Sequence, residues 1–262
     1  MATAYERVRI ARGAKRPTGI DYLQNVFHGF FELHGDRRYA DDPAIVGGLA
    51  YLGATPVTVI AIEKGHTAKE RVQRGFGAPQ PEGYRKALRL MREAEKFHRP
   101  VVCFVDTSGA GCNVGAEERG QGEAIAECLT MMSALQTPVL SILIGEGGSG
   151  GALALAAGDR VWMLENAVYS VISPEGCATI LWKDAAKAEQ AAEELKLTAD
   201  DALALGVVES VIPEAGLGEP EFYDALAQRL MREVDALTEM PIQELLSARY
   251  ARFRRFGGEA QR

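Results

Sequence analysis

The spacing of apolar residues along the chain changes between two periods and so predicts an alternation of helices and strands. Residues 20–31 carry apolar side chains at steps of three and four, which is typical of an amphipathic helix. Two β-rich runs, 44–52 and 56–62, are separated by a short turn that contains glycine, so they predict a hairpin. Residues 63–80 contain glycine and proline without an apolar period and predict a long loop. A helix is expected to begin at Pro81, because proline suits a first turn.

A unit of strand, glycine loop and helix then occurs twice in succession. In the first unit a strand at 101–106 leads to a helix at 116–135. In the second unit a strand at 138–144 leads to a helix at 152–158. Such alternation predicts a mainly parallel sheet with helices packed outside it.

The rest of the pattern completes a single-domain prediction. Further strands follow, and Thr198 with Asp201 resembles the capping box of a short helix. The last fifty residues predict two polar amphipathic helices. We therefore expect an α/β fold in one domain over residues 1–262, with an N-terminal helical segment at 1–40 and a C-terminal helical segment at 214–262.

Composition narrows the class of protein. The 262 residues are 47% hydrophobic and 25% charged, which is typical of a soluble globular protein. No apolar run approaches the roughly 20 residues of a membrane span, and no secretory signal is evident, so we expect a cytoplasmic location. The net charge of −7 argues against general nucleic-acid binding, which depends on cationic neutralisation of phosphates. The four cysteines and four histidines have no ligand spacing, so no metal site is expected.

A glycine-rich segment at 145–151, GEGGSGG, lies between a predicted strand and a predicted helix. Glycine lets the backbone approach another group closely, and the first N–H groups of a helix have no internal acceptor. Three interpretations follow: a phosphate cradle, an oxyanion hole, or close packing of helix on strand. The sequence lacks GxxxxGK[ST] and GxGxxG motifs, which disfavours the phosphate cradle.

A second glycine loop, DTSGAG at 106–111, follows the preceding strand. The carboxyl ends of neighbouring parallel strands lie at one edge of a sheet, where α/β proteins place ligands. The two loops are therefore expected to bring two sets of N–H groups to one cleft. Ser149 lies outside a GxSxG motif and has no histidine near it in the sequence, so no nucleophile triad is indicated. Donors without a base suit the stabilisation of an enolate or another oxyanion.

Positive charge is concentrated between residues 63 and 99. This stretch holds ten basic and five acidic side chains, whereas the rest of the chain holds nineteen and thirty-one. One interpretation is a solvated helix face. The other is attraction of an acidic partner or of a polyanionic ligand such as the phosphates of coenzyme A. The residues concerned are Arg85, Arg89, Arg92 and Lys96 on one face of the predicted helix, and Lys64, Lys69, Arg71 and Arg74 before it.

Several long blocks of the sequence resemble the α-subunit family of acetyl-coenzyme A carboxylase carboxyltransferase. The likeness runs over residues 5–213, in blocks such as FFELHGDR, DDPAIVGG, FGAPQPEGYRKALRLM, GAEERGQGEAIAE and IGEGGSGGALAL. The resemblance implies a crotonase-like fold, a spiral of ββα units. It also implies an enzyme, a transferase that moves carboxylate from carboxybiotin on a carrier protein to acetyl-CoA. The product would be malonyl-CoA, in the first committed step of fatty acid biosynthesis.

The resemblance also implies partners. The chain would be active only with a β subunit that carries a zinc ribbon, in an α2β2 assembly. A biotin carboxyl carrier protein and a biotin carboxylase would complete an ATP-dependent complex. The carrier protein would supply the carboxybiotin, so no covalently bound cofactor and no metal are expected in this chain. Neither a membrane nor a specific nucleic acid is expected as a partner.

By resemblance, the paired N–H donors of this subunit come from Gly150, Gly151 and Ala152, and Gly109 and Ala110 line the same cleft. The site is expected to face the biotin and to be complete only at the α/β interface. Which oxygen each loop serves stays open. Biotin freed of its carboxylate could itself remove the acetyl proton, which would account for the missing base. The residues expected to bind substrate are Gly147, Gly148, Ser149, Lys64, Lys69, Arg71, Arg89 and Arg92.

The sequence departs from the family's pattern in two segments. Where the family reads DTPGAYPGVGAEERGQ, Ser108 replaces the proline and residues 111–113, Gly-Cys-Asn, replace Tyr-Pro-Gly. Where the family reads GHQKGRDTKE, residues 61–70 read AIEKGHTAKE. Two alternatives therefore stay open. One is a related crotonase-type decarboxylase or carboxyltransferase component that acts on another acyl-CoA, and the other is a catalytically silent scaffold subunit.

Overall fold

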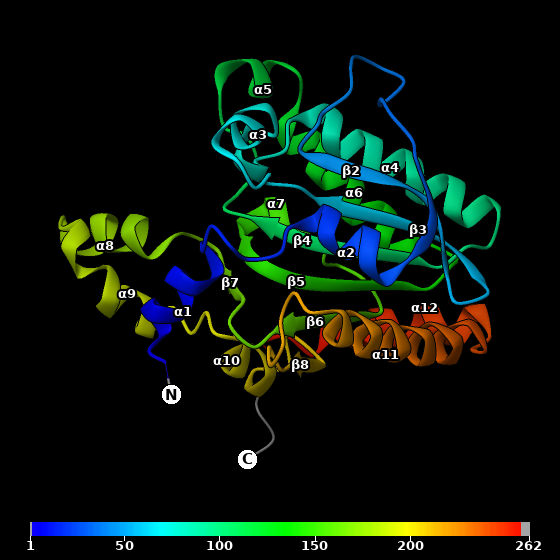
Figure 1. Cartoon of the computed structure of the whole chain (residues 1–262). Coiled ribbons are helices and arrows are strands. Elements are labelled where there is room, and N and C mark those ends of the chain that lie inside the picture. The colour runs from blue at the N-terminus through cyan, green and yellow to red at the C-terminus, as the bar shows by residue number, and fades with distance from the viewer. Residues whose placement is uncertain (1, 258–262) are drawn as a thin grey trace.

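The computed structural model describes residues 2–257 of the chain. Within this range eight strands form one sheet in the order β1-β2-β3-β4-β5-β6-β8, and β7 pairs with β5 outside this path (Figure 1). The pairs from β1 to β3 are antiparallel and the pairs from β3 onward are parallel. The strands are β1 (His28–Glu32), β2 (Ile45–Leu52), β3 (Thr55–Ile62), β4 (Val101–Thr107), β5 (Val139–Gly148), β6 (Arg160–Leu164), β7 (Val168–Ser170) and β8 (Ser210–Ile212).

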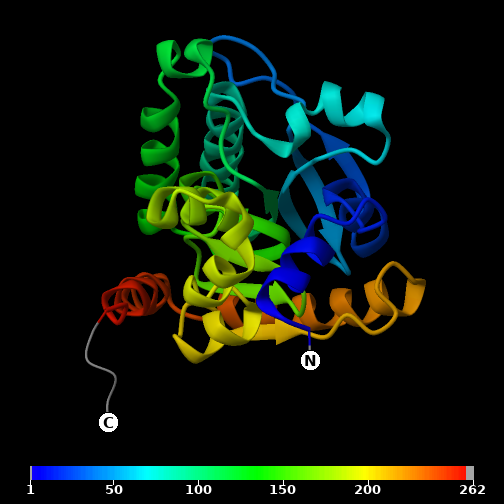
Figure 2. The ribbon, with the colours of Figure 1, turned by 90° about the vertical axis from the view of Figure 1, so that its left-hand side faces the viewer.

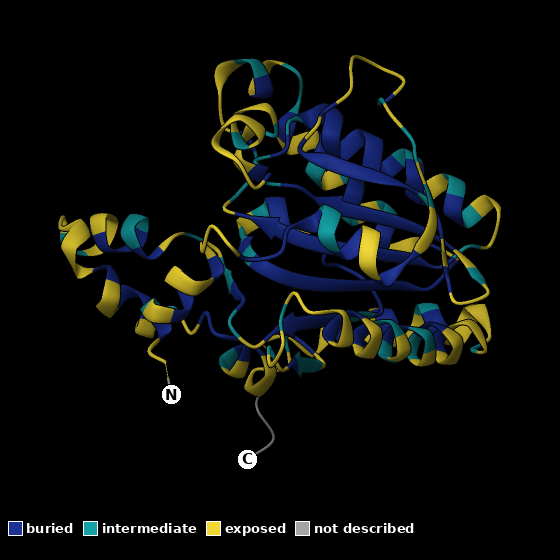
Figure 3. Cartoon of the chain, in the orientation of Figure 1, coloured by how far each residue is buried: buried dark blue, intermediate teal, exposed yellow. Residues whose placement is uncertain are grey.

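Helices cover both faces of the sheet (Figure 2). On one face, α4 (Pro81–Lys96) and α6 (Gln121–Ala134) pack against each other and α4 contacts β2 and β3. On the other face, α2 (Gly19–Val26) contacts β3 and β4 and packs against α11 (Pro220–Thr238). The strands between these layers are buried along most of their length (Figure 3). The predictions of a mainly parallel sheet with external helices and of a helix from Pro81 are confirmed.

The predicted hairpin is confirmed. β2 and β3 pair from Ile45 with Ile62 to Leu52 with Thr55, so residues 53 and 54 form a two-residue turn. Gly53 has a φ of +59°, which the first position of such a turn requires and glycine adopts without strain.

A small helical unit projects from one end of the sheet, at the left of Figure 1. It consists of α8 (Pro174–Trp182), the 3-10 turn η2 (Ala185–Lys187) and α9 (Ala188–Glu194), and α1 (Ala4–Ala11) packs against α9. Its apolar residues form two small clusters of their own, apart from the main core.

Up to residue 257, the C-terminal segment forms two helices, as predicted: α11 and then α12 (Ile242–Arg254), and residues 258–262 of the predicted segment lie outside the described residues. Before them, α10 (Ala199–Ala204) has the predicted capping box. None of the helices in residues 2–257 is long and apolar enough to cross a membrane.

The N-terminal forty residues are less helical than predicted. The helix expected over residues 20–31 ends at Val26, and residues 28–32 form β1 on the edge of the sheet. Gly29, with a φ of +63°, cannot continue the helix. A short apolar run such as Phe30 and Phe31 fits either period, so its spacing alone did not separate helix from strand.

The segment predicted to be a long loop, residues 63–80, contains α3 (Ala68–Gln73) and the 3-10 turn η1 (Gly75–Gly77). Thr67 and Glu70 cap α3 reciprocally. None of the six residues of this helix is buried, and for that reason it shows no apolar period in the sequence.

The two glycine loops also differ from their predicted boundaries. The helix expected at 116–135 is divided into α5 (Val114–Glu118) and α6 by Gly120, which has a φ of +79°. β5 continues four residues beyond its predicted end, so the first part of GEGGSGG is strand. The helix expected at 152–158 is the single turn α7 (Ser149–Leu153).

Candidate active site where β4 and β5 end

The register between β4 and β5 shifts at their carboxyl ends. Val105 pairs with Leu143, but Thr107 pairs with Gly147, so β5 holds two extra residues opposite Asp106. Bulges of this kind redirect a strand and are frequent beside active sites. Here the bulge displaces the end of β5 and the start of α7 relative to β4.

Asp106 fills this bulge. Its Oδ1 accepts the N–H of Glu146 at 2.7 Å. A Cβ at Gly145 would lie 2.3 Å from the same oxygen, so β5 can pass the carboxylate only with glycine at that position. The aspartate thus supplies the hydrogen bond that the interrupted strand pairing does not.

The two glycine segments lie against each other, as the sequence predicted. A Cβ at Gly148 would lie 2.2 Å from the carbonyl oxygen of Ser108, and a Cβ at Gly151 would lie 2.5 Å from the nitrogen of Ala110. Backbones approach this closely only where side chains are missing. We call the two facing segments, residues 108–110 and 148–151, the active-site mouth.

The N–H groups of the mouth differ in availability. Gly148 is the N-cap of α7, and the first four N–H groups of a helix, counted from the N-cap, have no acceptor within it, which here are those of residues 148–151. Ala152 follows these four residues, which disfavours the donor role that the resemblance implied. Gly109 donates its N–H to Thr107 Oγ1 at 3.0 Å. The N–H of Ala110 has no acceptor among residues 2–257, and no side chain in that range caps α7.

Lys64 lies in a charged cluster beside the mouth. Its Nζ is 2.6 Å from Asp106 Oδ1 and 3.0 Å from Glu146 Oε2. Burial alone would lower the pKa of Lys64, but the two carboxylates outweigh burial and raise it. Burial would raise the pKa of Glu146, but Lys64 and Arg12 outweigh it and hold this pKa below its ordinary value. Lys64 is therefore engaged with the protein's own carboxylates instead of being free for a ligand.

A polar cleft of about 230 Å³ opens beside this cluster and includes Ser108 of the mouth. Arg12 and Arg16 line it, and each is paired with an acid: Arg12 Nε lies 2.8 Å from Glu146, and Arg16 is paired with a glutamate near β8. Arg71 also lines the cleft and donates to a backbone carbonyl at 3.2 Å, but it has no ion pair with any residue that the structure describes. The predicted substrate-binding role of Arg71 is therefore compatible with its position.

An apolar groove of about 450 Å³ lies on the other side of the mouth and is lined by Ser149 and Gly150. Burial raises the pKa of Tyr169, in its wall, to about 12, so the hydroxyl stays protonated. Ser149 has a φ of +52°, a strained conformation for a residue other than glycine and a frequent feature of functional sites. The other apolar residues that line the groove include Leu153, Val171, Leu205, Phe253 and Phe256.

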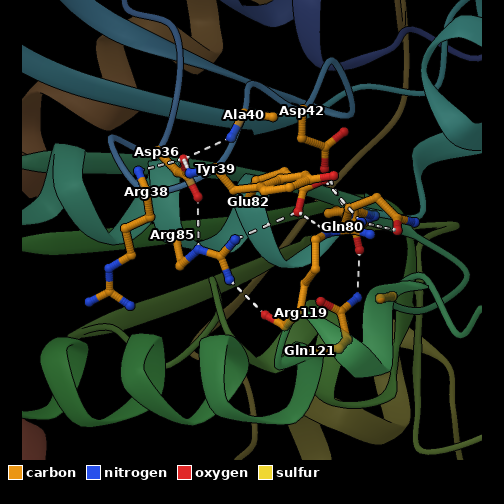
Figure 4. Close-up of polar contacts among 12 residues, drawn as sticks. Asp36, Arg38, Tyr39, Ala40, Asp42, Gln80, Glu82, Arg85, Arg119 and Gln121 are labelled. Atoms are coloured by element: carbon orange, nitrogen blue, oxygen red, sulfur yellow. Dashed lines mark hydrogen bonds and ion pairs between the residues drawn. The ribbon is translucent and has the colours of Figure 1, made fainter. Parts of the chain in front are cut away.

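Two arginines of the predicted positive face of α4 are bound by the protein itself, and Figure 4 shows one of them, Arg85. Arg85 Nε lies 2.8 Å from Asp36 Oδ2, and Arg85 Nη1 donates to the carbonyl of Arg119. Burial would raise the pKa of Asp36, but backbone N–H groups and Arg85 outweigh it and lower this pKa. Arg89 donates to the carbonyl of Gly35. Arg85 and Arg89 thus attach α4 to the loop between β1 and β2, whereas Arg92 and Lys96 on the same face are exposed, as in a solvated face.

The other predicted substrate-binding residues are divided between the mouth and the surface. Gly147 and Gly148 end β5, and Ser149 begins α7. Lys69 and Arg92 are exposed and do not line the cleft or the groove. Within the described chain no group of three His, Cys, Asp or Glu residues is placed to hold a metal ion.

The sequence interpretation missed the residues whose side chains hold the two segments of the mouth in place. Asp106 and Glu146 stood inside the two glycine motifs, and a charged residue at the end of an apolar strand was a usable signal. Arg12 lies far from both motifs in the sequence, so no local pattern could have placed it beside Glu146. The same holds for Tyr84, which lies beneath α7.

Comparisons with known proteins identify relatives over nearly the whole chain. A family described as acetyl co-enzyme A carboxylase carboxyltransferase-like matches residues 1–257. A protein of Ruminiclostridium cellulolyticum named acetyl-coenzyme A carboxylase carboxyl transferase subunit alpha is 57% identical over 255 residues, which cover 97% of this chain and 98% of the relative. A protein of Natranaerobius thermophilus named subunits beta/alpha of the same enzyme is 52% identical over 259 residues, which cover 97% of this chain and 43% of the relative.

Solved structures share the fold. A Pseudomonas malonate decarboxylase hetero-tetramer in complex with coenzyme A contains a chain with a TM-score of 0.71 at 18% identity, covering 91% of this chain and 98% of that chain. Transcarboxylase 12S has a TM-score of 0.68 at 19% identity, covering 84% of this chain and 42% of that chain, so this chain spans less than half of it. These likenesses show the fold alone, and they confirm the crotonase-like prediction.

Proposed function

The chain belongs to the acetyl-coenzyme A carboxylase carboxyltransferase α-subunit family, and on that premise we propose how it works with its partner. Together with a β subunit it is an enzyme that transfers carboxylate from carboxybiotin to acetyl-CoA and forms malonyl-CoA. This reaction supplies fatty acid biosynthesis. The observation that carries the proposal is the contact between the two glycine segments, which forms a mouth of backbone donors within this family's fold.

The donors at the mouth serve an oxygen that gains negative charge during the transfer. Ala110 offers an N–H without an acceptor in the described chain, and the first turn of α7 offers those of Gly150 and Gly151. Donors that are fixed before the reaction stabilise such charge without reorganisation, and each contributes about 3–4 kcal/mol by mutagenesis. We assign these donors to the urea oxygen of biotin, which leaves the thioester oxygen to the β subunit.

Proton removal from the acetyl group falls outside this chain. The titratable residues beside the mouth, Lys64, Asp106 and Glu146, are held in one ion-paired cluster. The pKa of Lys64 is raised and that of Glu146 is lowered, so both stay charged and neither is poised to exchange a proton near neutral pH. Biotin freed of its carboxylate is the base that we propose.

Among the proposed partners, the β subunit is the one that the names of the relatives support most directly. The Natranaerobius relative has the name of both subunits, and this chain matches less than half of it. We propose that the β subunit completes the mouth, carries the zinc ribbon and forms an α2β2 assembly with this chain in the cytoplasm. A biotin carboxyl carrier protein and a biotin carboxylase supply the carboxybiotin.

The altered loop at residues 108–113 does not argue for a silent subunit. Thr107 Oγ1 donates to the carbonyl of Gly109 at 2.8 Å and fixes the turn. The N–H of Gly111 donates to Pro79, and Gln121 donates to the carbonyl of Gly111 at 2.9 Å. These hydrogen bonds hold the loop in the absence of the prolines that the family has.

The experiment is to combine the purified chain with the β subunit from the same source, a carboxylated biotin carrier and acetyl-CoA. Malonyl-CoA formation that requires both subunits is the expected result. A stable complex that forms none would favour the scaffold alternative, and faster turnover of another acyl-CoA would favour the related enzyme. Either result would overturn the proposal.

A further inference from the structure

One buried hydroxyl lies directly beneath the first turn of α7. Tyr84, on α4, is fully buried, and its hydroxyl donates to the carbonyl oxygen of Gly151 at 3.1 Å. A Cβ at Gly151 would lie 2.7 Å from that hydroxyl and 2.5 Å from the nitrogen of Ala110. Gly151 is therefore held between the tyrosine and the loop of the mouth.

The hydrogen bonding of α7 leaves this carbonyl to the tyrosine. Ala154 donates its N–H to Gly150, and Leu155 donates its N–H to Ala152. The carbonyl of Gly151, between these two acceptors, receives the hydroxyl of Tyr84. Burial raises the pKa of Tyr84 well above its ordinary value, so the hydroxyl keeps the proton that it donates.

α7 is held by tertiary contacts with β4, β5 and α6 and has no capping side chain among the described residues. It is five residues long. Isolated helices of one turn are not stable, so the position of α7 depends on the contacts that it makes. Gly151 both contacts the backbone of residues 109 and 110 and accepts the hydrogen bond from Tyr84.

We propose that Tyr84 is a positioning residue for carboxyl transfer: its hydroxyl holds the Gly151 peptide so that the first turn of α7 stays against residues 108–110. This inference rests on the proposed function, because it assigns the orientation of the proposed donors to a side chain on another helix. Tyr84 itself touches no reacting atom.

The chain offers a matched control in Tyr22. It is also fully buried, and its hydroxyl has no hydrogen-bond partner within the described residues. Its ring stacks on Phe104 with centroids 5.1 Å apart, on the opposite face of the sheet from α4. Replacing Tyr22 by phenylalanine removes a hydroxyl of equal burial without breaking a hydrogen bond.

The test compares Tyr84→Phe and Tyr22→Phe with the unchanged chain, each assembled with the β subunit. Tyr84→Phe is expected to lower kcat about ten-fold, because small displacements of positioned groups reduce rates by one to two orders of magnitude, with KM for acetyl-CoA unchanged within two-fold. Hydrogen exchange measured by mass spectrometry should be faster in the peptide covering residues 149–155. Tyr22→Phe should alter neither kcat nor this exchange.

Two results would overturn the inference: unchanged exchange at residues 149–155 in Tyr84→Phe, or a kcat for Tyr84→Phe equal to that of Tyr22→Phe. Failure of the proposed function gives a different result, since the unchanged assembly would then form no malonyl-CoA. In that case the exchange experiment still decides whether Tyr84 holds α7, because it does not depend on turnover.

Discussion

Missing side chains at single positions make the mouth possible. At Gly151 a Cβ would lie 2.5 Å from the backbone nitrogen of Ala110, a separation that Cβ atoms do not reach without movement of the backbone. Gly122, on α6, has nothing within 4 Å of its added Cβ. Replacing each glycine in turn therefore distinguishes a requirement for close approach at Gly151 from the general effect of glycine in a helix.

We expect Gly151→Ala to lower kcat about a hundred-fold or more, since the added methyl separates α7 from residues 108–110 and misplaces the donors. Gly122→Ala should leave kcat within two-fold of the unchanged enzyme. Steady-state kinetics of both variants with the β subunit is the measurement, with circular dichroism to verify folding. Equal turnover in the two variants would show that the contact has no part in the reaction.

The sequence identified the residues of the mouth but not those that hold it. Gly109, Ala110, Gly150 and Gly151 were recognisable because glycine motifs are local and follow strands. The role of Tyr84 in holding the mouth could not be inferred in this way, because it depends on a hydrogen bond to a carbonyl distant in the sequence. The role of Asp106 could not be inferred in this way either, because it depends on the register shift between β4 and β5. Ala152 was named as a donor by resemblance to the family, and whether its N–H is available depends on the residue at which α7 begins.

At the scale of elements, the ends of β4 and β5 are joined by charge as well as by pairing. Lys64 follows β3, Asp106 is in β4 and Glu146 is in β5, so one cation connects three neighbouring strands. Each of these side chains is at most 16% exposed, so removing one partner leaves a charge that water cannot fully solvate.

Lys64→Met should destabilise the chain by about 3–5 kcal/mol at pH 7, the usual cost of breaking a buried pair from one side. The pKa of Glu146 is held below 4.5 in the folded chain, so its stabilising contribution is present above pH 4.5 and is lost as pH falls through the folded value. The difference in the free energy of unfolding between Lys64→Met and the unchanged chain should therefore narrow as the pH falls below 4.5.

Urea unfolding at pH 7 and at pH 4 measures this difference in the free energy of unfolding, and Lys69→Met is the control. Lys69 is exposed on α3, so its replacement should change the free energy of unfolding by less than about 0.5 kcal/mol. Equal destabilisation by Lys64→Met at pH 7 and pH 4 would contradict the assignment of ion pairing to this cluster.

The positive stretch of the sequence divides into two elements with different roles. Arg71, at the end of α3, lines the polar cleft, whereas Arg92, on α4, is exposed outside it. Arg71→Ala is expected to raise KM for acetyl-CoA about three- to five-fold with little change in kcat, since a partly exposed charge contributes up to about 1 kcal/mol. Arg92→Ala should leave KM unchanged. If both variants raised KM equally, long-range electrostatic attraction would explain the effect, and a contact of Arg71 in the cleft would not.

Elements with long buried runs or a long buried face were predicted correctly, and the short helix α10 was predicted from its capping box, whereas α3 and α7 were not predicted correctly. β2, β3 and β4 are mostly buried along their length, and α4 has a buried face along its length. α3 buries none of its residues, and α7 is one turn long, so neither leaves a periodic trace in the sequence.

At the scale of the whole molecule, one buried arginine fixes the C-terminal helix α12 to the end of α6, to the segment before β5 and to the residue before β6. Arg249, on α12, is fully buried and lies 2.7 Å from Asp159 Oδ1. Its guanidinium also donates to the carbonyls of Met132, Leu135 and Thr137. α12 carries two residues that line the apolar groove, so this attachment also shapes one wall beside the mouth.

Arg249→Ala is therefore expected to destabilise the chain by about 3–5 kcal/mol, because it leaves Asp159 and three carbonyls without their partner. Arg254→Ala, which removes an exposed arginine from the same helix, should cost less than about 0.5 kcal/mol. Thermal and denaturant unfolding of the two variants gives the comparison. A small cost for Arg249→Ala would mean that α12 is held by its apolar contacts alone.

The most direct measurement for the whole assembly is an experimental structure of this chain with its β subunit and a biotin-bearing carrier domain. We predict that the urea oxygen of biotin lies about 2.7–3.1 Å from the backbone nitrogens of Ala110 and of the first turn of α7. Biotin bound elsewhere, or β-subunit side chains covering the backbone N–H groups of residues 108–110 and 148–151, would contradict the proposal that these two segments form the site of carboxyl transfer.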